Sequence, residues 1–225
     1  MIDQNGELPL HLLRLASPSL PVGTFSYSRG LEAAVEAGWV TDEPAASEWI
    51  LGTLEHSLAP LDGALFLRMM TALAAGDIDA LQRFDAWLAA ARESRELQQE
   101  DRRMAEALLS LLKELDACKD EKLLTSLRTY PAAFALAAHH WHVAPLPALK
   151  GLFWTVVDGQ VAAALRLMRM GQTAGQRILI ASIPVIERSA AAAARLGENE
   201  IGNVSVAMAM ASARHETQYS RLFRS

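Results

Sequence analysis

Residues 12–32 read LLRLASPSLPVGTFSYSRGLE, and this stretch determines how the first helices are connected. Its apolar start predicts a helix that ends near Ser17. Pro18 and Pro21 then favour extended backbone, because proline disfavours helical geometry in the residue before it. Pro21 followed by Gly23 two residues later suits a type I turn. The stretch therefore predicts a helix, a turning connection and a second helix.

The second helix is expected to start at Thr24 or Ser26, whose hydroxyl oxygens can accept hydrogen bonds from free amides. Gly38 is expected to end it at the C-terminal cap. Gly30 lies inside this predicted helix, where glycine is about 1 kcal/mol less favourable than alanine. We therefore expect another part of the chain to pack closely against Gly30.

Two interpretations of this stretch stay open from the residues alone. The first is a helix–loop–helix corner within a core. The second is a polar and aromatic surface on which another chain docks, made of Phe25, Ser26, Tyr27, Ser28 and Glu32.

The rest of the chain has helical periodicity almost throughout. A helix through Trp49 is expected to end at Pro60, and the segment from Ala148 to Met170 is apolar on most sides, as in a helix buried within a bundle. We find no alternating strand pattern. The prediction is an all-α, compact single-domain bundle of residues 1–225 with roughly eight to ten helices, in which 1–8 and 214–225 are flexible or partner-ordered tails.

The run Arg92 to Glu106 is rich in charge. Opposite charges one helical turn apart, such as Glu100 and Arg103, are typical of a solvated helix face. The polar segment Lys119 to Thr129 is expected to be a connector.

Composition limits the functional classes. The 225 residues carry a formal net charge of −5, which gives no basic footprint for nucleic acid. Cys118 is the single cysteine, so an internal disulfide is excluded and a reducing compartment is favoured. The first ten residues lack the basic and apolar regions of a signal peptide. We expect a cytoplasmic protein.

Motifs for catalysis and for cofactors are missing from the sequence. There is no GxxxxGK[ST] phosphate-binding loop, and the segment Ser26 to Gly30 lacks the leading glycine of a nucleophile elbow. His139 and His142 share a helix face, but no carboxylate or cysteine within the next turn completes a metal site. The sequence predicts a protein that is not an enzyme and holds no cofactor or metal.

The tail from Arg214 to Ser225 mixes arginines with tyrosine and phenylalanine. Chain ends are usually loose, but arginine and aromatic residues are typical of interface hot spots. Residues 215–225 follow an apolar helix that ends near Ala213, so we expect them to occupy no core position.

Four segments together resemble the UreF family of urease accessory proteins. They are LPVGTFSYSRGLE (Leu20–Glu32), ARESREL (Ala91–Leu97), MRMGQTAGQ (Met168–Gln176) and SARHETQYSRLFRS (Ser212–Ser225). Their order is that of the family, and they span nearly the whole chain. Thr24 departs from the pattern, because the family usually has a second glycine there, and threonine does not easily adopt positive φ.

The resemblance implies an all-α, homodimeric scaffold that joins UreD (also called UreH) and the GTPase UreG to urease apoprotein. By this resemblance, the complex would deliver nickel and carbamylate the active-site lysine. The candidate partner-binding residues are Pro21, Gly23, Phe25, Ser26, Tyr27, Ser28, Gly30, Glu32, Gln172, Gln176, Arg214, His215, Glu216, Gln218, Tyr219, Arg221, Leu222, Phe223 and Arg224. For Gln172 and Gln176, a nickel passage, a partner contact or a simple helix cap remain as alternatives.

An alternative function is direct regulation of the UreG GTPase. Arginines in the charge-rich run, such as Arg95 or Arg102, are candidates for a finger that stabilises transition-state charge. GTP turnover with and without this protein separates the two functions.

Overall fold

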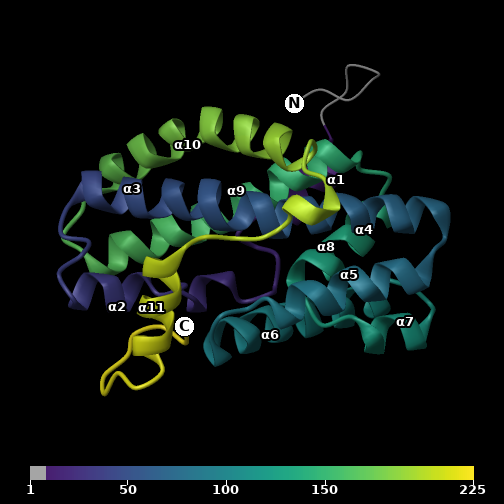
Figure 1. The fold of residues 1–225 in the computed structure, drawn as a ribbon, viewed down its shortest axis with the longest axis horizontal. Helices are drawn as coiled ribbons and strands as arrows, with labels where there is room; N and C mark the ends of the chain where they lie inside the picture. The colour runs from purple at the N-terminus through teal and green to yellow at the C-terminus, as the bar shows by residue number, and fades with distance from the viewer. Residues whose placement is uncertain (1–8) are drawn as a thin grey trace.

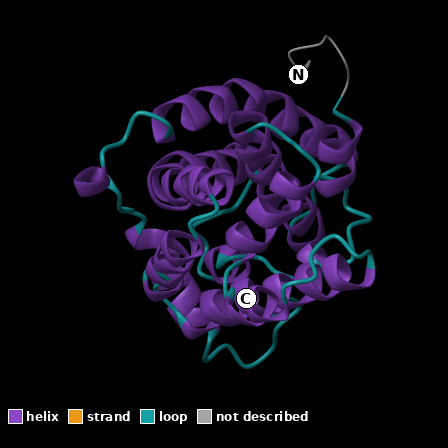
Figure 2. Ribbon diagram, turned by 90° about the vertical axis from the view of Figure 1, so that its right-hand side faces the viewer, coloured by secondary structure: helices purple, strands orange, loops and turns teal. Residues whose placement is uncertain are grey.

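The computed structural model of the protein describes residues 9–225, and every regular element in that range is helical (Figure 1). Figure 2, turned by 90°, shows helices packed around one another and joined by loops, with no strand in the described part. The all-α prediction is confirmed. The predicted flexible segment 1–8 lies outside the described residues.

The elements follow one another along the chain with short connections. The α-helices are α1 (Leu10–Leu15), α2 (Leu31–Glu36), α3 (Glu43–Thr53), α4 (Ala64–Ala75), α5 (Ile78–Ala90), α6 (Arg95–Glu114), α7 (Glu121–Ser126), α8 (Tyr130–His140), α9 (Pro145–Leu167), α10 (Gln172–Ala193) and α11 (Val206–His215). The other helical segments are the 3₁₀ turns η1 (Thr24–Ser26) and η3 (Glu198–Glu200) and the π-helix η2 (Leu54–Gly63).

Helix α9 lies in the middle of the core. It packs against α10, α2, α3, α4 and α8, and Figure 1 shows α10 lying along it. Its buried apolar residues come from several sides of the helix and include Leu149, Leu152, Phe153, Val157 and Val161. The prediction of a buried central helix is confirmed.

Helices α3 and α4 are joined by η2 into one helical run, Glu43–Ala75. We expected Pro60 to end this helix, and that is wrong, because η2 passes through it. Proline lacks an N–H, so the His56 carbonyl four residues earlier has no α-helical donor. The Val204 N–H donates to that carbonyl instead (3.2 Å), and the Gly202 N–H donates to the Pro60 carbonyl (3.4 Å). The segment after α10 therefore donates two hydrogen bonds to carbonyls of the π-helix η2.

The run Glu43–Ala75 is long and apolar enough to cross a membrane, but 67% of its most apolar window is buried inside the protein. That burial is what a core helix requires. A Cβ on Gly63 would lie 2.7 Å from the Phe153 ring, so glycine lets α9 approach the run closely.

Gly30 lies just before α2 and not within a helix. The predicted helix start at residues 24–26 is wrong: those residues form η1, and α2 starts at Leu31. Gly30 has a left-handed φ of +80°, and a Cβ there would lie 3.0 Å from the backbone nitrogen of Ser212 in α11. The predicted close packing is confirmed. Gly38, with φ +73°, follows the end of α2 as expected.

Two polar segments are more buried than their composition predicts. Residues 119–129, expected to be a connector, contain α7, and Leu123, Leu124 and Leu127 point into the core. The charge-rich run 92–106 was expected to be a solvated face, and this is wrong for residues 92–101, where carboxylates and an arginine are buried. Their charges are neutralised partly within the run, where Arg92 pairs with Asp101, and partly by other segments of the chain.

Candidate functional site

The first two turns of α6 bring three carboxylates into the interior. The Ser94 hydroxyl caps the helix by accepting the Leu97 N–H at 3.1 Å. Glu96, Glu100 and Asp101 follow at spacings that place them on one side of the helix, and all three are buried. A buried carboxylate is tolerated when a cation or hydrogen-bond donors pair with it. The partners of these three groups define the site.

Glu100 pairs with Arg29 of the 20–32 stretch. Arg29 Nε lies 2.7 Å from Glu100 Oε1, and both side chains are buried. Burial lowers the pKa of the Arg29 guanidinium, but the Glu100 carboxylate raises it, and the net pKa is above its ordinary value. Arg29 therefore stays charged and ties the stretch to α6.

His215 bridges two carboxylates from different helices. Its ring is fully buried, with Nδ1 2.6 Å from Glu96 Oε2 and Nε2 3.1 Å from Glu32 Oε2. Each ring nitrogen therefore has a carboxylate oxygen of a different helix within hydrogen-bond distance. This one side chain therefore connects α11 with α2 and α6.

The residues after α11 complete the hydrogen bonds of the same two glutamates. The N–H groups of Leu222 and Phe223 donate to the two Glu32 oxygens at 2.7 and 2.8 Å. Arg221 Nη1 lies 2.7 Å from Glu96 Oε1. Among the described residues, every hydrogen-bond donor to the Glu32 and Glu96 carboxylates comes from His215 or from this following segment.

Ser225 is buried against the 20–32 stretch. Its carbonyl oxygen accepts hydrogen bonds from both the N–H (2.7 Å) and the hydroxyl of Ser28, and its own hydroxyl donates to Glu100 Oε2 at 2.6 Å. The Arg224 N–H donates to the Ser26 carbonyl at 2.8 Å. Figure 1 shows the yellow C-terminal segment beside α2 and α6.

We call this assembly the tail network. Its members are Ser28, Arg29, Glu32, Glu96, Glu100, His215, Arg221 and Ser225. The expectation that residues 215–225 occupy no core position is therefore corrected. His215, Phe223 and Ser225 are buried, because the tail carries the donors that the buried glutamates need.

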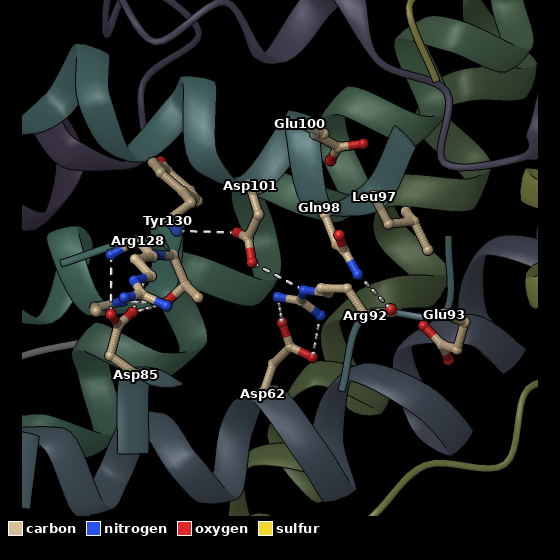
Figure 3. Close-up of polar contacts among 12 residues, drawn as sticks. Asp62, Asp85, Arg92, Glu93, Leu97, Gln98, Glu100, Asp101, Arg128 and Tyr130 are labelled. Atoms are coloured by element: carbon tan, nitrogen blue, oxygen red, sulfur yellow. Dashed lines mark hydrogen bonds and ion pairs between the residues drawn. The ribbon is translucent and has the colours of Figure 1, made fainter. Parts of the chain in front are cut away.

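A second buried network, which we call the Arg92 network, joins α6 to η2 and α8. The Arg92 guanidinium binds Asp62 of η2 through two nitrogens, at 2.6 and 3.0 Å, and Asp101 through Nε at 2.8 Å. The other Asp101 oxygen accepts the Tyr130 N–H of α8 at 2.9 Å (Figure 3). Burial lowers the pKa of Arg92, but the two aspartates raise it well above its ordinary value. Four segments are thus fixed relative to one another.

The predicted partner-binding residues divide by exposure. The exposed ones are Pro21, Phe25, Gln172, Gln176, Arg214, Tyr219, Arg221, Leu222 and Arg224. The half-buried ones are Gly23, Ser26, Glu216 and Gln218. The buried ones are Tyr27, Ser28, Gly30, Glu32, His215 and Phe223. The structure brings the members from the 20–32 stretch and from the tail together, whereas Gln172 and Gln176 lie at the start of α10 and outside the tail network.

Sequence reasoning missed the buried role of Glu96 and Glu100. A usable signal was present, because these glutamates continue the i, i+4 stripe that Met104 and Leu108 form on α6. Acids on the apolar stripe of a helix indicate buried, paired carboxylates. Arg29 was missed too, and its isolated positive charge in a stretch of small residues gave no such signal.

A sequence model of the UreF family matches residues 40–183. The chain belongs to the UreF family. It is 57% identical over 217 residues to the urease accessory protein UreF 2 of Brucella anthropi, an alignment that covers 96% of each chain. The urease accessory protein UreF of Alkalilimnicola ehrlichii is 40% identical over 95% of this chain and 94% of its own. The urease accessory protein UreF of Teredinibacter turnerae is 42% identical over 96% of this chain and 98% of its own.

The UreF match ends within α10, so both the 20–32 stretch and the tail lie outside residues 40–183. The alignments to individual UreF relatives extend over nearly the full length. Similarity to UreF relatives therefore extends beyond residues 40–183.

Proposed function

We propose that this UreF-family protein is a non-catalytic scaffold for urease maturation. It joins UreD/UreH and the GTPase UreG to urease apoprotein in the cytoplasm, for nickel insertion and lysine carbamylation. Family membership and full-length relatives named urease accessory proteins support the maturation role. The nucleotide chemistry is assigned to UreG, because this sequence carries no phosphate-binding loop.

The observation that carries the proposal is the two-sided arrangement of the tail. Its inner side is fixed by the tail network. Its outer side exposes Tyr219, Leu222 and Arg224 beside the stretch that carries the exposed Phe25. Aromatic and arginine side chains dominate interface hot spots, and a surface that is already ordered loses less entropy on binding. We assign UreD/UreH to this face.

A pair of surface substitutions tests the assignment. Tyr219→Ala with Leu222→Ala removes exposed side chains and leaves the backbone bond to Glu32 intact. We expect the melting temperature to stay unchanged and UreD/UreH binding to weaken at least about tenfold, the loss of about 1.4 kcal/mol. Leu115→Ala, which truncates another exposed leucine at the end of α6, is the control. Full-strength binding by the double variant in a titration would contradict the assignment.

We assign homodimerisation to a different surface. Exposed Leu13 of α1 and Ile183 of α10 line a groove of about 540 Å³ between these helices and α9, and the same two helices also expose Leu10 and Ile180. Exposed apolar patches of this kind mark interaction sites. A mass of 24.5 kDa by light scattering, that of one chain, would contradict the dimer.

The alternative, regulation of UreG, depends on arginines that a GTPase can reach. Arg95 and Arg102 are both exposed on α6. A drop in UreG turnover on substituting either with alanine, with complex formation unchanged, favours regulation over scaffolding. Unchanged turnover favours the scaffold.

A further inference from the structure

A groove of about 910 Å³ lies between α5 and α6, away from the tail network. Figure 1 shows α6 at the lower centre of the molecule, with α5 and α7 to its right. Ala86, Ala89 and Ala90 of α5 form one wall, and α6 forms the other. Buried leucines, including Leu109 and Leu124, form its floor. The groove is therefore apolar at the bottom and open to solvent.

The rim of this groove is basic, although the whole chain has a net charge of −5. Three exposed cations line it, Arg102, Lys113 and Arg128, against one exposed carboxylate, Glu106. Arg102 pairs with Glu106 at 2.8 Å, and Lys113 pairs with Glu121 at 2.8 Å.

Those ion pairs are solvent-exposed, and such pairs contribute little to stability. Replacing Glu106 and Glu121 by carboxylates of a partner therefore costs little free energy. The Arg128 guanidinium makes no ion pair with any described residue. The cations of the rim can therefore pair with carboxylates of a partner.

Hydrogen bonds hold the backbone at the inner end of the groove in place, and Figure 3 shows the residues that make them. The Asp85 carboxylate accepts the N–H groups of Arg128 and Thr129 at 2.9 Å each, and the Thr129 hydroxyl at 2.6 Å. The Arg92 network holds Asp101 of the facing helix in place. A preformed groove binds with less ordering than a flexible surface.

We propose that this groove binds an acidic amphipathic helix of a partner protein. The leucine floor accepts the apolar face of the helix, and the alanines let its backbone approach α5. Glutamates or aspartates on the flanks of the helix pair with Arg102, Lys113 and Arg128. Helix-in-groove recognition of this kind combines apolar anchors with flanking charge. The proposal is independent of the assignment of the tail to UreD/UreH.

The test uses the full-length protein and synthetic peptides of about 18 residues. One peptide has leucines at i, i+3, i+4 and i+7 and glutamates on the flanks, and its twin has lysine in place of every glutamate. A third probe, a single-stranded DNA 12-mer, carries negative charge without an apolar face. We expect the glutamate peptide to bind in the micromolar range, about tenfold or more tighter than either other probe, with an affinity that falls as salt rises.

Matched charge reversals locate the binding. Arg102→Glu with Arg128→Glu is expected to weaken the glutamate peptide about tenfold. Arg103→Glu, the neighbouring exposed arginine that does not line the groove, is expected to change affinity less than about twofold. Circular dichroism checks that each variant stays folded. Equal binding of the peptide twins, binding of the DNA as tight as that of the glutamate peptide, no binding up to millimolar concentration, or an equal loss in Arg103→Glu would each overturn the proposal.

Discussion

At the scale of single residues, Gly30 meets two demands at once. Its φ of +80° lies in the left-handed region, and the backbone nitrogen of Ser212 approaches to within 3.0 Å of where a Cβ would be. Gly38 has nearly the same φ, +73°, but open space around it. The two glycines therefore separate the effect of backbone conformation from that of close packing.

We expect Gly30→Ala to destabilise the protein more than Gly38→Ala. Both variants carry the strain of a side chain at positive φ, roughly 1–2 kcal/mol. Gly30→Ala also has to push α11 away from α2, and overpacking of this kind adds about 1–3 kcal/mol. Urea unfolding of both variants gives the difference directly. Equal losses of unfolding free energy in the two variants would show that α11 moves away from residue 30 with no measurable loss of stability.

The sequence determines which residue types lie in the site but not which of them are buried. Glu96 and Arg102 belong to the same charged run, yet Glu96 is buried and Arg102 is exposed. The difference arises because the tail, more than a hundred residues later in the chain, covers only one side of α6. The local periodicity of α6 does not indicate which of its sides the tail covers. The tail itself was recognisable as a functional segment, but its donors to Glu32 and Glu96 were not.

At the scale of elements, two ion pairs tie α10 to the long run Glu43–Ala75. Arg177 binds Glu43 through two nitrogens at 2.6 and 2.7 Å, and Arg188 binds Glu55 in the same way at 2.8 and 3.1 Å. Hydrogen bonds from these arginines hold the pKa of both glutamates below the ordinary value. The pairs therefore contribute a pH-dependent part of the stability.

The direction of the pH dependence follows from the lowered pKa values. A carboxylate whose pKa is lower in the folded state stabilises the fold above its unfolded pKa, about 4.3 for glutamate. That contribution is lost as the pH falls through the folded pKa. We expect Arg177→Ala with Arg188→Ala to reduce the drop in melting temperature between pH 7 and about pH 3.5.

Arg195→Ala is the control, because this exposed arginine near the end of α10 forms no ion pair with a described residue. The melting temperature of this control should change with pH as that of the unsubstituted protein does. If the double variant did so as well, the two pairs would contribute nothing to the coupling between α10 and the run.

Helices were predictable where apolar spacing is long and regular, as in α9. Pro60 was misjudged for a physical reason, since its effect depends on whether another N–H can donate to the carbonyl four residues earlier, which a proline cannot do. Val204 does so at the His56 carbonyl. That donor comes from a loop about 150 residues later, so no rule restricted to neighbouring residues identifies it.

At the scale of the whole molecule, deletion of residues 216–225 is expected to destabilise the bundle. It removes Arg221 and the N–H donors of Leu222 and Phe223, and it leaves Glu32 with His215 as its single remaining partner. Breaking buried ionic contacts on one side typically lowers the unfolding free energy by about 3–5 kcal/mol. Urea unfolding followed by circular dichroism measures this loss.

A second substitution distinguishes lost pairing from lost packing. In the truncated protein, Glu32→Gln replaces an underpaired carboxylate with a neutral amide, whose burial is less unfavourable. Part of the lost stability should return. A truncated chain that unfolds at the same urea midpoint as the intact one would show instead that the tail network is not maintained in solution.

The contact between Ser28 and Ser225 closes a loop of 197 residues. At typical synthesis rates of 5–20 residues per second, roughly 10–40 s pass between the emergence of the two from the ribosome. Throughout that interval Glu32 has none of its three donors, and the face assigned to UreD/UreH does not exist. We therefore expect a nascent chain to be incompetent for assembly until residues 212–225 have been translated and have left the ribosome.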